Sequence, residues 1–353
     1  MSPALLALAC TPEPTGGGPA EAPVDPDSLA ALGLLEWDGA EFTYADGVES
    51  YRLGTPLFSD FASKDRAIRV PEGEVVTYVA PGVLSFPLGT VIVKSFSFPA
   101  DLRAPEVDRR VIETRVLTLE ADGWDTWPYL WDEDQTGAVK APSGAVLDLS
   151  VVGLDGAPLT FPYLVPQRNQ CVDCHAAGLE GDTENVPIGP TARNLDVDGQ
   201  LERWADAGWL VGLPALERGR PATDATTLVG VDPATLPDQA LFDAARDYLD
   251  INCAHCHNPA GDEGRSSQLF LNWDNEDQFR LGLCKKPGSA GNGTGGFVYD
   301  IVPGHPEESI LRYRMETVEL GEMMPDLGRG LVDAPGVALV SEWIRRLEGE
   351  CSE

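Results

Sequence analysis

The chain has 353 residues, 43% of them hydrophobic, which is enough to build two or three domains, and no apolar run is long enough to span a bilayer. Its 25 Lys and Arg residues are outnumbered by 57 Asp and Glu residues, so the formal net charge is −32. This charge argues against nucleic acid as a partner, because phosphates are bound by Lys and Arg. It favours a protein partner with a basic docking surface, although an acidic surface that serves only solubility is an equally good explanation.

Residues 1–27 predict a signal and a disordered tether. A short apolar run ends at Ala9 and Cys10, and a stretch rich in Pro, Gly and acidic residues follows. The pattern resembles a bacterial lipoprotein signal, in which Cys10 is lipidated and becomes the first residue of the mature chain. It departs from that signal because no Lys or Arg precedes the apolar run; a frayed terminus is the alternative. We therefore expect a periplasmic or cell-envelope lipoprotein whose only contact with a membrane is this anchor.

Residues 28–168 predict a β-rich domain. Strands are indicated by β-branched residues and by apolar–polar alternation in three stretches: 86–98, 111–120 and 145–156. Several short strands separated by Gly, Pro and Asp-Gly turns are typical of a β-sandwich or barrel-like domain. The aromatic stretch GWDTWPYLW is expected in the core, with a ligand platform as the alternative.

The rest of the chain divides at about residue 230. Residues 169–230 open with NQCVDCHAAG and are rich in Gly and Pro, with one helical stretch, LERWADAGWL. Residues 231–353 predict mainly helices, because apolar residues recur there at three- and four-residue spacing. The helical stretches are PDQALFDAARDYLDINCAHCH, HPEESILRYRM and GVALVSEWIRRLEG.

Both of these segments contain the pentapeptide Cys-x-x-Cys-His. The first copy is Cys171, Cys174 and His175, and the second is Cys253, Cys256 and His257. Two thiols three residues apart lie on one face of a helical turn, and the histidine lies on the same stripe. This spacing suits haem c, in which each thiol adds to a porphyrin vinyl group and the imidazole binds the iron. We therefore expect two covalently attached haem c groups.

Two other kinds of site use the Cys-x-x-Cys pair. A zinc ribbon has two such pairs about 15–20 residues apart. Here about 80 residues separate the pairs, and a histidine follows each of them. A thioredoxin-like redox site needs a βαβ context, which the sequence lacks. Both explanations are weaker than haem.

The second haem needs a sixth iron ligand, and three methionines lie downstream of its histidine. Met324 precedes a proline in GEMMPDLG, a Gly- and Pro-bounded loop that could reach the haem face. We predict it as the ligand, ahead of its neighbour Met323. Met315 lies inside a predicted helix, where a role in the core is expected. The alternative is that all three methionines only pack.

The first haem has no such ligand nearby. Between His175 and Asn252 there is neither Met nor His, and the preceding residues hold only Met1. A sixth ligand must therefore come from the C-terminal region, through His255, His305 or a spare methionine, or from a weaker donor such as Lys or Tyr. The remaining possibility is a five-coordinate iron, open to chemistry other than electron transfer.

Two cysteines remain, Cys284 and Cys351. In an oxidising compartment spare thiols commonly pair, so we expect a disulfide between the Cys284 loop and the C-terminal tail. Two unrelated free thiols are the alternative.

Several stretches of the chain are similar to a known family. They are TPLFSDFASKDR, FPLGTVIVKSF, VIETRVL, GWDTWPYLWDEDQTGAV, VPQRNQCVDCH, GPTARNLD, INCAHCHNP, YDIVPGHPEESILRYRM and MMPDLGRG, and they cover about residues 50–345. The chain resembles bacterial diheme c-type cytochromes with a β-rich amino-terminal half, and its C-terminal part resembles a cytochrome c domain. This implies an exported α+β multidomain electron carrier, in which a mainly α-helical cytochrome c-like domain follows the first haem segment. One departure is His305, where the family pattern has Asp.

A weaker similarity points to an enzyme. The order GTVIVK, Gly-Trp and Cys-x-x-Cys-His resembles cytochrome P-460, whose five-coordinate haem is cross-linked to a lysine. Lys94 would be that lysine, although an exposed or snorkelling strand lysine is the simpler explanation. Three hypotheses follow: an electron carrier, a haem enzyme such as a peroxidase or a P-460-like oxidase, and a β-rich module that docks the cytochrome to a partner. The first is preferred.

Overall fold

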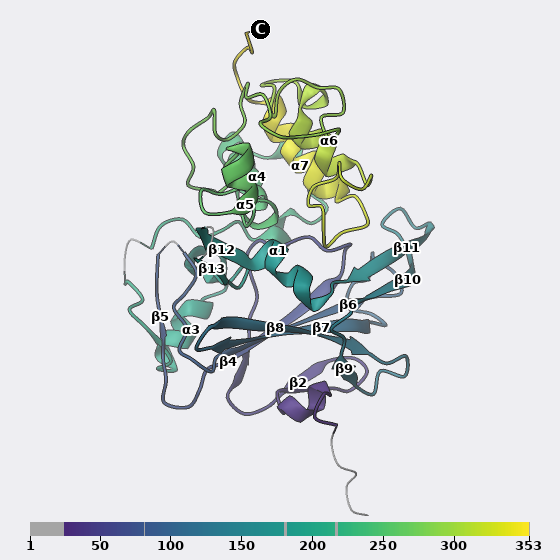
Figure 1. Ribbon diagram of the computed structural model, residues 1–353, viewed down its shortest axis with the longest axis vertical. Helices are drawn as coiled ribbons and strands as arrows, with labels where there is room; N and C mark the ends of the chain where they lie inside the picture. The colour runs from purple at the N-terminus through teal and green to yellow at the C-terminus, as the bar shows by residue number, and fades with distance from the viewer. Residues whose placement is uncertain (1–24, 81, 180–181, 216–217, 353) are drawn as a thin grey trace, which may run out of the picture.

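The computed structural model describes residues 25–352 except 81, 180–181 and 216–217, so the expected lipidation site Cys10 lies outside the described residues. In Figure 1 the strands, coloured purple to teal, form the lower part of the molecule, and helices α4 to α7, in green and yellow, form the upper part. The chain passes from a β-rich region into a helical one, which confirms the predicted α+β class.

The strands are β1 (Leu35–Trp37), β2 (Phe42–Tyr44), β3 (Val48–Ser50), β4 (Ser63–Arg69), β5 (Val76–Thr77), β6 (Val91–Phe98), β7 (Arg110–Glu120), β8 (Gly123–Trp131), β9 (Ala138–Lys140), β10 (Ala145–Val152), β11 (Pro158–Val165), β12 (Ala176–Leu179), β13 (Asp182–Asn185) and β14 (Leu210–Val211). The α-helices are α1 (Cys171–His175), α2 (Ala192–Leu195), α3 (Gln200–Asp206), α4 (Asp238–Asn252), α5 (Asp262–Ser267), α6 (Ile310–Glu316) and α7 (Ala334–Arg345). Short 3₁₀ turns are η1 (Leu29–Leu32), η2 (Arg168–Gln170), η3 (Ala225–Leu228), η4 (Pro233–Thr235) and η5 (Pro306–Glu308).

The largest sheet has six antiparallel strands in the order β3-β4-β6-β7-β8-β9, and because β3 and β9 lie at its edges, this sheet is open rather than a closed barrel. One face packs on the N-terminal segment through Val93 and Val116. The opposite face is covered at one end by the segment that holds α2 and α3, through Ile92 and Leu117. At its other end the β10–β11 hairpin packs on Phe96, so the second layer of a sandwich is present as a two-stranded hairpin.

Helices α4, α6 and α7 pack around one apolar core in the C-terminal region. Leu241 and Leu249 lie on the buried face of α4 that their spacing predicts, and Val340 of α7 belongs to the same cluster. A disulfide joins Cys284 to Cys351, with 5.2 Å between their Cα atoms, and ties the last residues to this region. Within the described ranges, no helix combines the length and the apolar character that crossing a membrane requires.

Two buried aspartates join the helical region to the earlier parts of the chain. Asp247 of α4 is 1% exposed and accepts hydrogen bonds from Arg193 at 2.6 Å and Arg220 at 2.7 Å. Asp60, in the loop before β4, accepts hydrogen bonds from the backbone N–H groups of Gly330 at 2.8 Å and Leu331 at 2.7 Å. These contacts position α4 and the loop after α6 relative to the sheet.

Candidate cofactor-binding site

The two Cys-x-x-Cys-His motifs lie against each other. Helix α1 consists of the first motif alone, and the second motif begins with Cys253, where α4 ends. The Sγ of Cys256 lies 3.6 Å from the carbonyl oxygen of Asp173, although 83 positions separate these residues in the chain. Cys174 lines the same cavity as the second motif. Figure 1 shows α1 between the sheet and the pair α4 and α5. The fold therefore brings both motifs to one place.

The four motif cysteines carry free thiols. Burial raises the pKa of Cys174 to about 11 and the pKa values of Cys253 and Cys256 to about 12. A four-thiolate zinc site would hold every sulfur about 2.3 Å from one ion. In the described part of the chain, however, only an exposed histidine–glutamate cluster brings three or more ligand atoms within 4.8 Å of one another. The arrangement of the thiols therefore disfavours zinc.

His175 has the orientation and protonation state of a metal ligand. Its Nδ1 lies 2.6 Å from the carbonyl oxygen of Val186, so a protonated Nδ1 donates there and Nε2 keeps its lone pair. Burial lowers the pKa of His175 to about 4, and the charges of Lys94 and Arg115 act in the same direction. Burial also lowers the pKa of His257 to about 4. Both imidazoles are neutral at neutral pH, which is the form that binds iron.

An apolar cavity adjoins the second motif. It holds about 920 Å³ of space between atoms, the part open to solvent included. Cys253, Cys256 and His257 line it, together with Met324 from the loop after α6. Its apolar wall includes Leu269, Leu271, Ile310, Leu311 and Met315. Two thiols, an imidazole and a thioether around an apolar space fit a haem c.

The structure distinguishes the two neighbouring methionines. Met324 lines the cavity, whereas Met323 is 5% exposed and is not among the lining residues. The N–H of Met324 donates to the carbonyl oxygen of Arg314 at 2.8 Å, and its own carbonyl oxygen accepts from Nε of Arg329 at 3.2 Å. Arg329 also donates to three other backbone carbonyls. This buried guanidinium holds the Met324 loop, and sequence reasoning missed it because its role depends on carbonyls that meet only in the folded chain.

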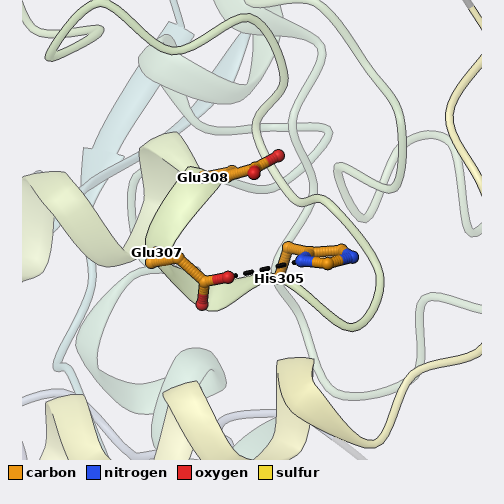
Figure 2. Close-up of side chains that lie close together, drawn as sticks. All are labelled: His305, Glu307 and Glu308. Atoms are coloured by element: carbon orange, nitrogen blue, oxygen red, sulfur yellow. Dashed lines mark hydrogen bonds and ion pairs between the residues drawn. The ribbon is translucent and has the colours of Figure 1, made fainter.

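The two remaining histidines have different surroundings. His255 is half-buried and lines the same cavity, and its buried Nδ1 has no hydrogen-bond partner. Its charge would lower the pKa of His175, so the two rings lie near each other. His305 is exposed, and its Nδ1 lies 3.3 Å from a carboxylate oxygen of Glu307. Figure 2 shows these two side chains with Glu308 at the turn that leads into α6. The structure therefore favours His255 over His305 as a neighbour of the first motif.

Lys94 differs from the exposed strand lysine that its position on a predicted strand suggests. It is half-buried on β6, and burial, followed by the charges of Arg66 and Lys64, places its pKa well below the ordinary value. Among the described residues its ammonium group has no hydrogen-bond or ion-pair partner, and it lies 4.9 Å from the centre of the Phe96 ring. This half-buried lysine without a polar partner is the second feature that sequence reasoning did not anticipate.

Comparisons with known proteins add no assignment. No family model, no curated protein and no solved structure matches the chain. What the site can do is therefore inferred from its own residues and geometry.

Proposed function

We propose that this protein is an exported diheme c-type cytochrome that carries electrons between redox partners. The observation that supports this most strongly is the meeting of the two Cys-x-x-Cys-His motifs, whose Cys256 and Asp173 lie 3.6 Å apart. Two porphyrins attached at such close positions would lie near enough for electrons to pass between them. Neither a zinc site nor a dithiol enzyme accounts for two motifs with four free thiols and two neutral histidines.

The second haem would be held by Cys253, Cys256, His257 and Met324. Each thiol would add across one vinyl double bond, so that a C–S bond forms and the thiol proton moves to the neighbouring carbon, with no oxidant required. His257 and Met324 would bind the iron from within the cavity, and the bound iron supplies one-electron chemistry. We propose that residues 231–353 form a cytochrome c-like domain around this site.

The first haem would be held by Cys171, Cys174 and His175. The hydrogen bond of His175 to Val186 would fix the ring orientation and raise the basicity of Nε2, as second-shell carbonyls do for other metal-bound histidines. The sixth position would be filled by His255, which is the neighbouring histidine without a hydrogen bond at its buried Nδ1, or would stay open. In both cases Cys171 and Cys174 would attach the porphyrin.

The redox partner would present a basic surface. The formal charge of −32 creates a negative field that accelerates encounter with a cationic protein and weakens as salt is added. The proposed location is the periplasm or cell envelope, with a lipid anchor at Cys10, because attachment of haem c and the Cys284–Cys351 disulfide both suit an oxidising compartment.

A pyridine haemochrome assay combined with mass spectrometry tests the proposal on the mature chain, made in a host with haem-attachment machinery. We expect two porphyrins per chain. The double variant Cys171→Ser/Cys174→Ser should keep one, and Cys253→Ser/Cys256→Ser should keep the other. A wild-type chain without added porphyrin would refute the proposed function.

A haem enzyme, such as a peroxidase or a P-460-like oxidase, is the second candidate. The observation that favours it is the unpartnered Lys94, whose charge acts on His175. The spin state decides between the two functions. Two low-spin haems that bind no carbon monoxide when reduced support the carrier, whereas a high-spin first haem that reacts with peroxide or hydroxylamine supports the enzyme.

A further inference from the structure

Three cations lie side by side on one face of the large sheet. In the strand register Arg66 of β4 is opposite Lys94 of β6, and Lys94 is opposite Arg115 of β7. Residues directly opposite each other point to the same face with their Cβ atoms about 4.5–5.5 Å apart, and like charges in that position destabilise a sheet. We call these three residues the cationic row. A row of this kind needs compensation.

The protein supplies little compensation of its own. Glu113, which is fully buried, is the carboxylate on this face, and it already binds Arg115 at 2.9 Å and the hydroxyl of Tyr163 at 2.7 Å. Arg66 is 7% exposed, and its Nη2 has no hydrogen-bond partner. Lys94 has no polar partner within the described residues. Among the described residues, neither Arg66 nor Lys94 therefore has an ion-pair partner, in a chain whose formal net charge is −32.

The row lies between two apolar patches of the same sheet face. On one side of the row, Ile68, Ile92 and Leu117 lie opposite one another on neighbouring strands and pack on the segment that holds α2 and α3. On the other side, Phe96 packs on the β10–β11 hairpin. The row thus borders the apolar core at both ends, where an uncompensated charge is costly.

The first motif lies on the same face of the sheet as the cationic row: Cys171 lines a pocket with Thr126 of β8, and Thr126 is opposite Leu117, which shares its face with Arg115. Burial raises the pKa values of Cys171 and Cys174, and the charge of Arg115 opposes that rise. Burial lowers the pKa of His175, and the charges of Lys94 and Arg115 act in the same direction. A group attached to these thiols would therefore lie within reach of the row. Guanidinium and ammonium groups in such an arrangement recognise carboxylates and other oxyanions.

We infer that the cationic row of Arg66, Lys94 and Arg115 binds a carboxylate, and that this carboxylate is a propionate of the porphyrin carried by Cys171 and Cys174. The inference rests on the proposed function. A free anion must approach through the field of a chain with a charge of −32, whereas a propionate arrives with the covalently attached porphyrin and avoids that barrier. The cavity beside the second motif has no comparable row, because Arg314 is the only Lys or Arg among the described residues that line it, and Asp300, Asp326 and Glu263 also line it.

Resonance Raman spectroscopy and redox titration of the holoprotein test this assignment. In Lys94→Met and Arg66→Met the propionate bending band of the first haem should move, and its midpoint potential should fall, because a nearby cation favours the reduced iron. The second haem should keep its potential. Lys94→Arg should restore both readouts. The control Lys140→Met removes a cation from β9 of the same sheet, which pairs with Asp27 at 3.3 Å, and should change neither readout.

Three outcomes would overturn the inference. One is an unmoved propionate band and first-haem potential in folded Lys94→Met and Arg66→Met that still carry two porphyrins. Another is a first-haem spectrum that responds to added acetate or inorganic phosphate in the wild type but not in Lys94→Met, which would make the row a site for a free anion. The third, a wild-type chain without porphyrin on Cys171 and Cys174 by mass, would refute the proposed function itself and is recognised before any variant is made.

Discussion

The two copies of one pentapeptide lie close together but have different neighbours. Around the second, the chain provides an apolar cavity and a methionine held by Arg329. Around the first, it provides a sheet face with Lys94 and Arg115, and the sequence has no methionine between His175 and Asn252. In the proposed diheme protein, the same motif would attach both porphyrins while its neighbours would give the two irons different environments. Axial ligand, burial and nearby charge are the variables that tune haem potentials. The contrast therefore predicts two haems with separate potentials.

The largest expected effect comes from removing the feature that distinguishes the second site. Met324→Ala should abolish the far-red methionine–iron absorption band and lower the potential of the second haem by a sizeable fraction of the ~0.8 V range that axial ligands span. Met323→Ala is the matched control. It truncates a buried side chain and should lower the free energy of unfolding by about 2–5 kcal/mol without moving the potential. Spectroelectrochemical titration measures the potential, and thermal denaturation measures the free energy of unfolding. Reversed results would make Met323 the ligand.

The next largest effect is expected from a substitution at Asp247, which positions α4 relative to the sheet. Asp247→Ala should destabilise the protein by about 3–5 kcal/mol, because it leaves Arg193, whose side chain is 4% exposed, with only its longer 3.7 Å pair to Asp250. Burial tends to raise the pKa of Asp247, but hydrogen bonds from Arg220 and Arg193 hold it below the ordinary value. The stabilisation is therefore present above the unfolded pKa and is lost as the pH falls through the folded one.

Chemical denaturation across pH measures this effect. Asp243→Ala, which removes the 3.3 Å partner of Arg220 at a more exposed position, should cost less than about 1 kcal/mol. Equal losses in the two variants would contradict the role given to Asp247.

A third change should affect only the surroundings of the second site. Replacing both Cys284 and Cys351 with Ser opens a loop of 67 residues, for which the chain-entropy treatment gives about 4 kcal/mol of lost stability. Chemical denaturation of the wild-type protein with its disulfide intact and of the double variant measures this difference in stability. The spectrum and potential of the first haem should remain unchanged; a shift there would mean that the two sites are more tightly coupled than their ligand sets indicate.

The smallest effect concerns the end of α4, next to the second motif. Burial raises the pKa of Asp250 to about 6, so its contribution to stability is fully present below about pH 4 and is lost as the pH rises through 6. Asp250→Asn, which can still accept the hydrogen bond from the N–H of Trp273, should stabilise the protein at pH 7 by about 1–3 kcal/mol. It should also flatten the pH profile between 4 and 6. If Asp250→Asn instead lowers the free energy of unfolding at pH 7, then the charged Asp250 carboxylate does not destabilise the folded protein.

Local patterns predicted the parts of the structure that local forces determine. The helix over α4 and the one over α7 follow from apolar spacing, and the Cys284–Cys351 pair follows from counting cysteines. The contact between the motifs could not be predicted in this way, because it joins residues 83 positions apart in the chain. The hydrogen bonds of Asp60 and Asp247 likewise join groups distant in the sequence.

The cationic row was hidden from sequence reasoning for a similar reason. Arg66, Lys94 and Arg115 are unremarkable strand residues until the strand register places them opposite one another. A one-residue change of register would move Lys94 to the other face. The pairing also shifts between Phe96 and Ser97, an irregularity that no sequence pattern announced.

The hydrogen bonds from Gly330 and Leu331 to Asp60 bear on how the molecule can be dissected. They connect the loop after α6, which bears Met324, to the loop before β4, about 270 residues earlier in the chain. A C-terminal fragment cut out at α4 would keep its thiols and His257 but lose this anchor for the loop that bears Met324. If the second motif carries the proposed haem, a fragment without the β-rich half would therefore not reproduce the position of its proposed methionine ligand.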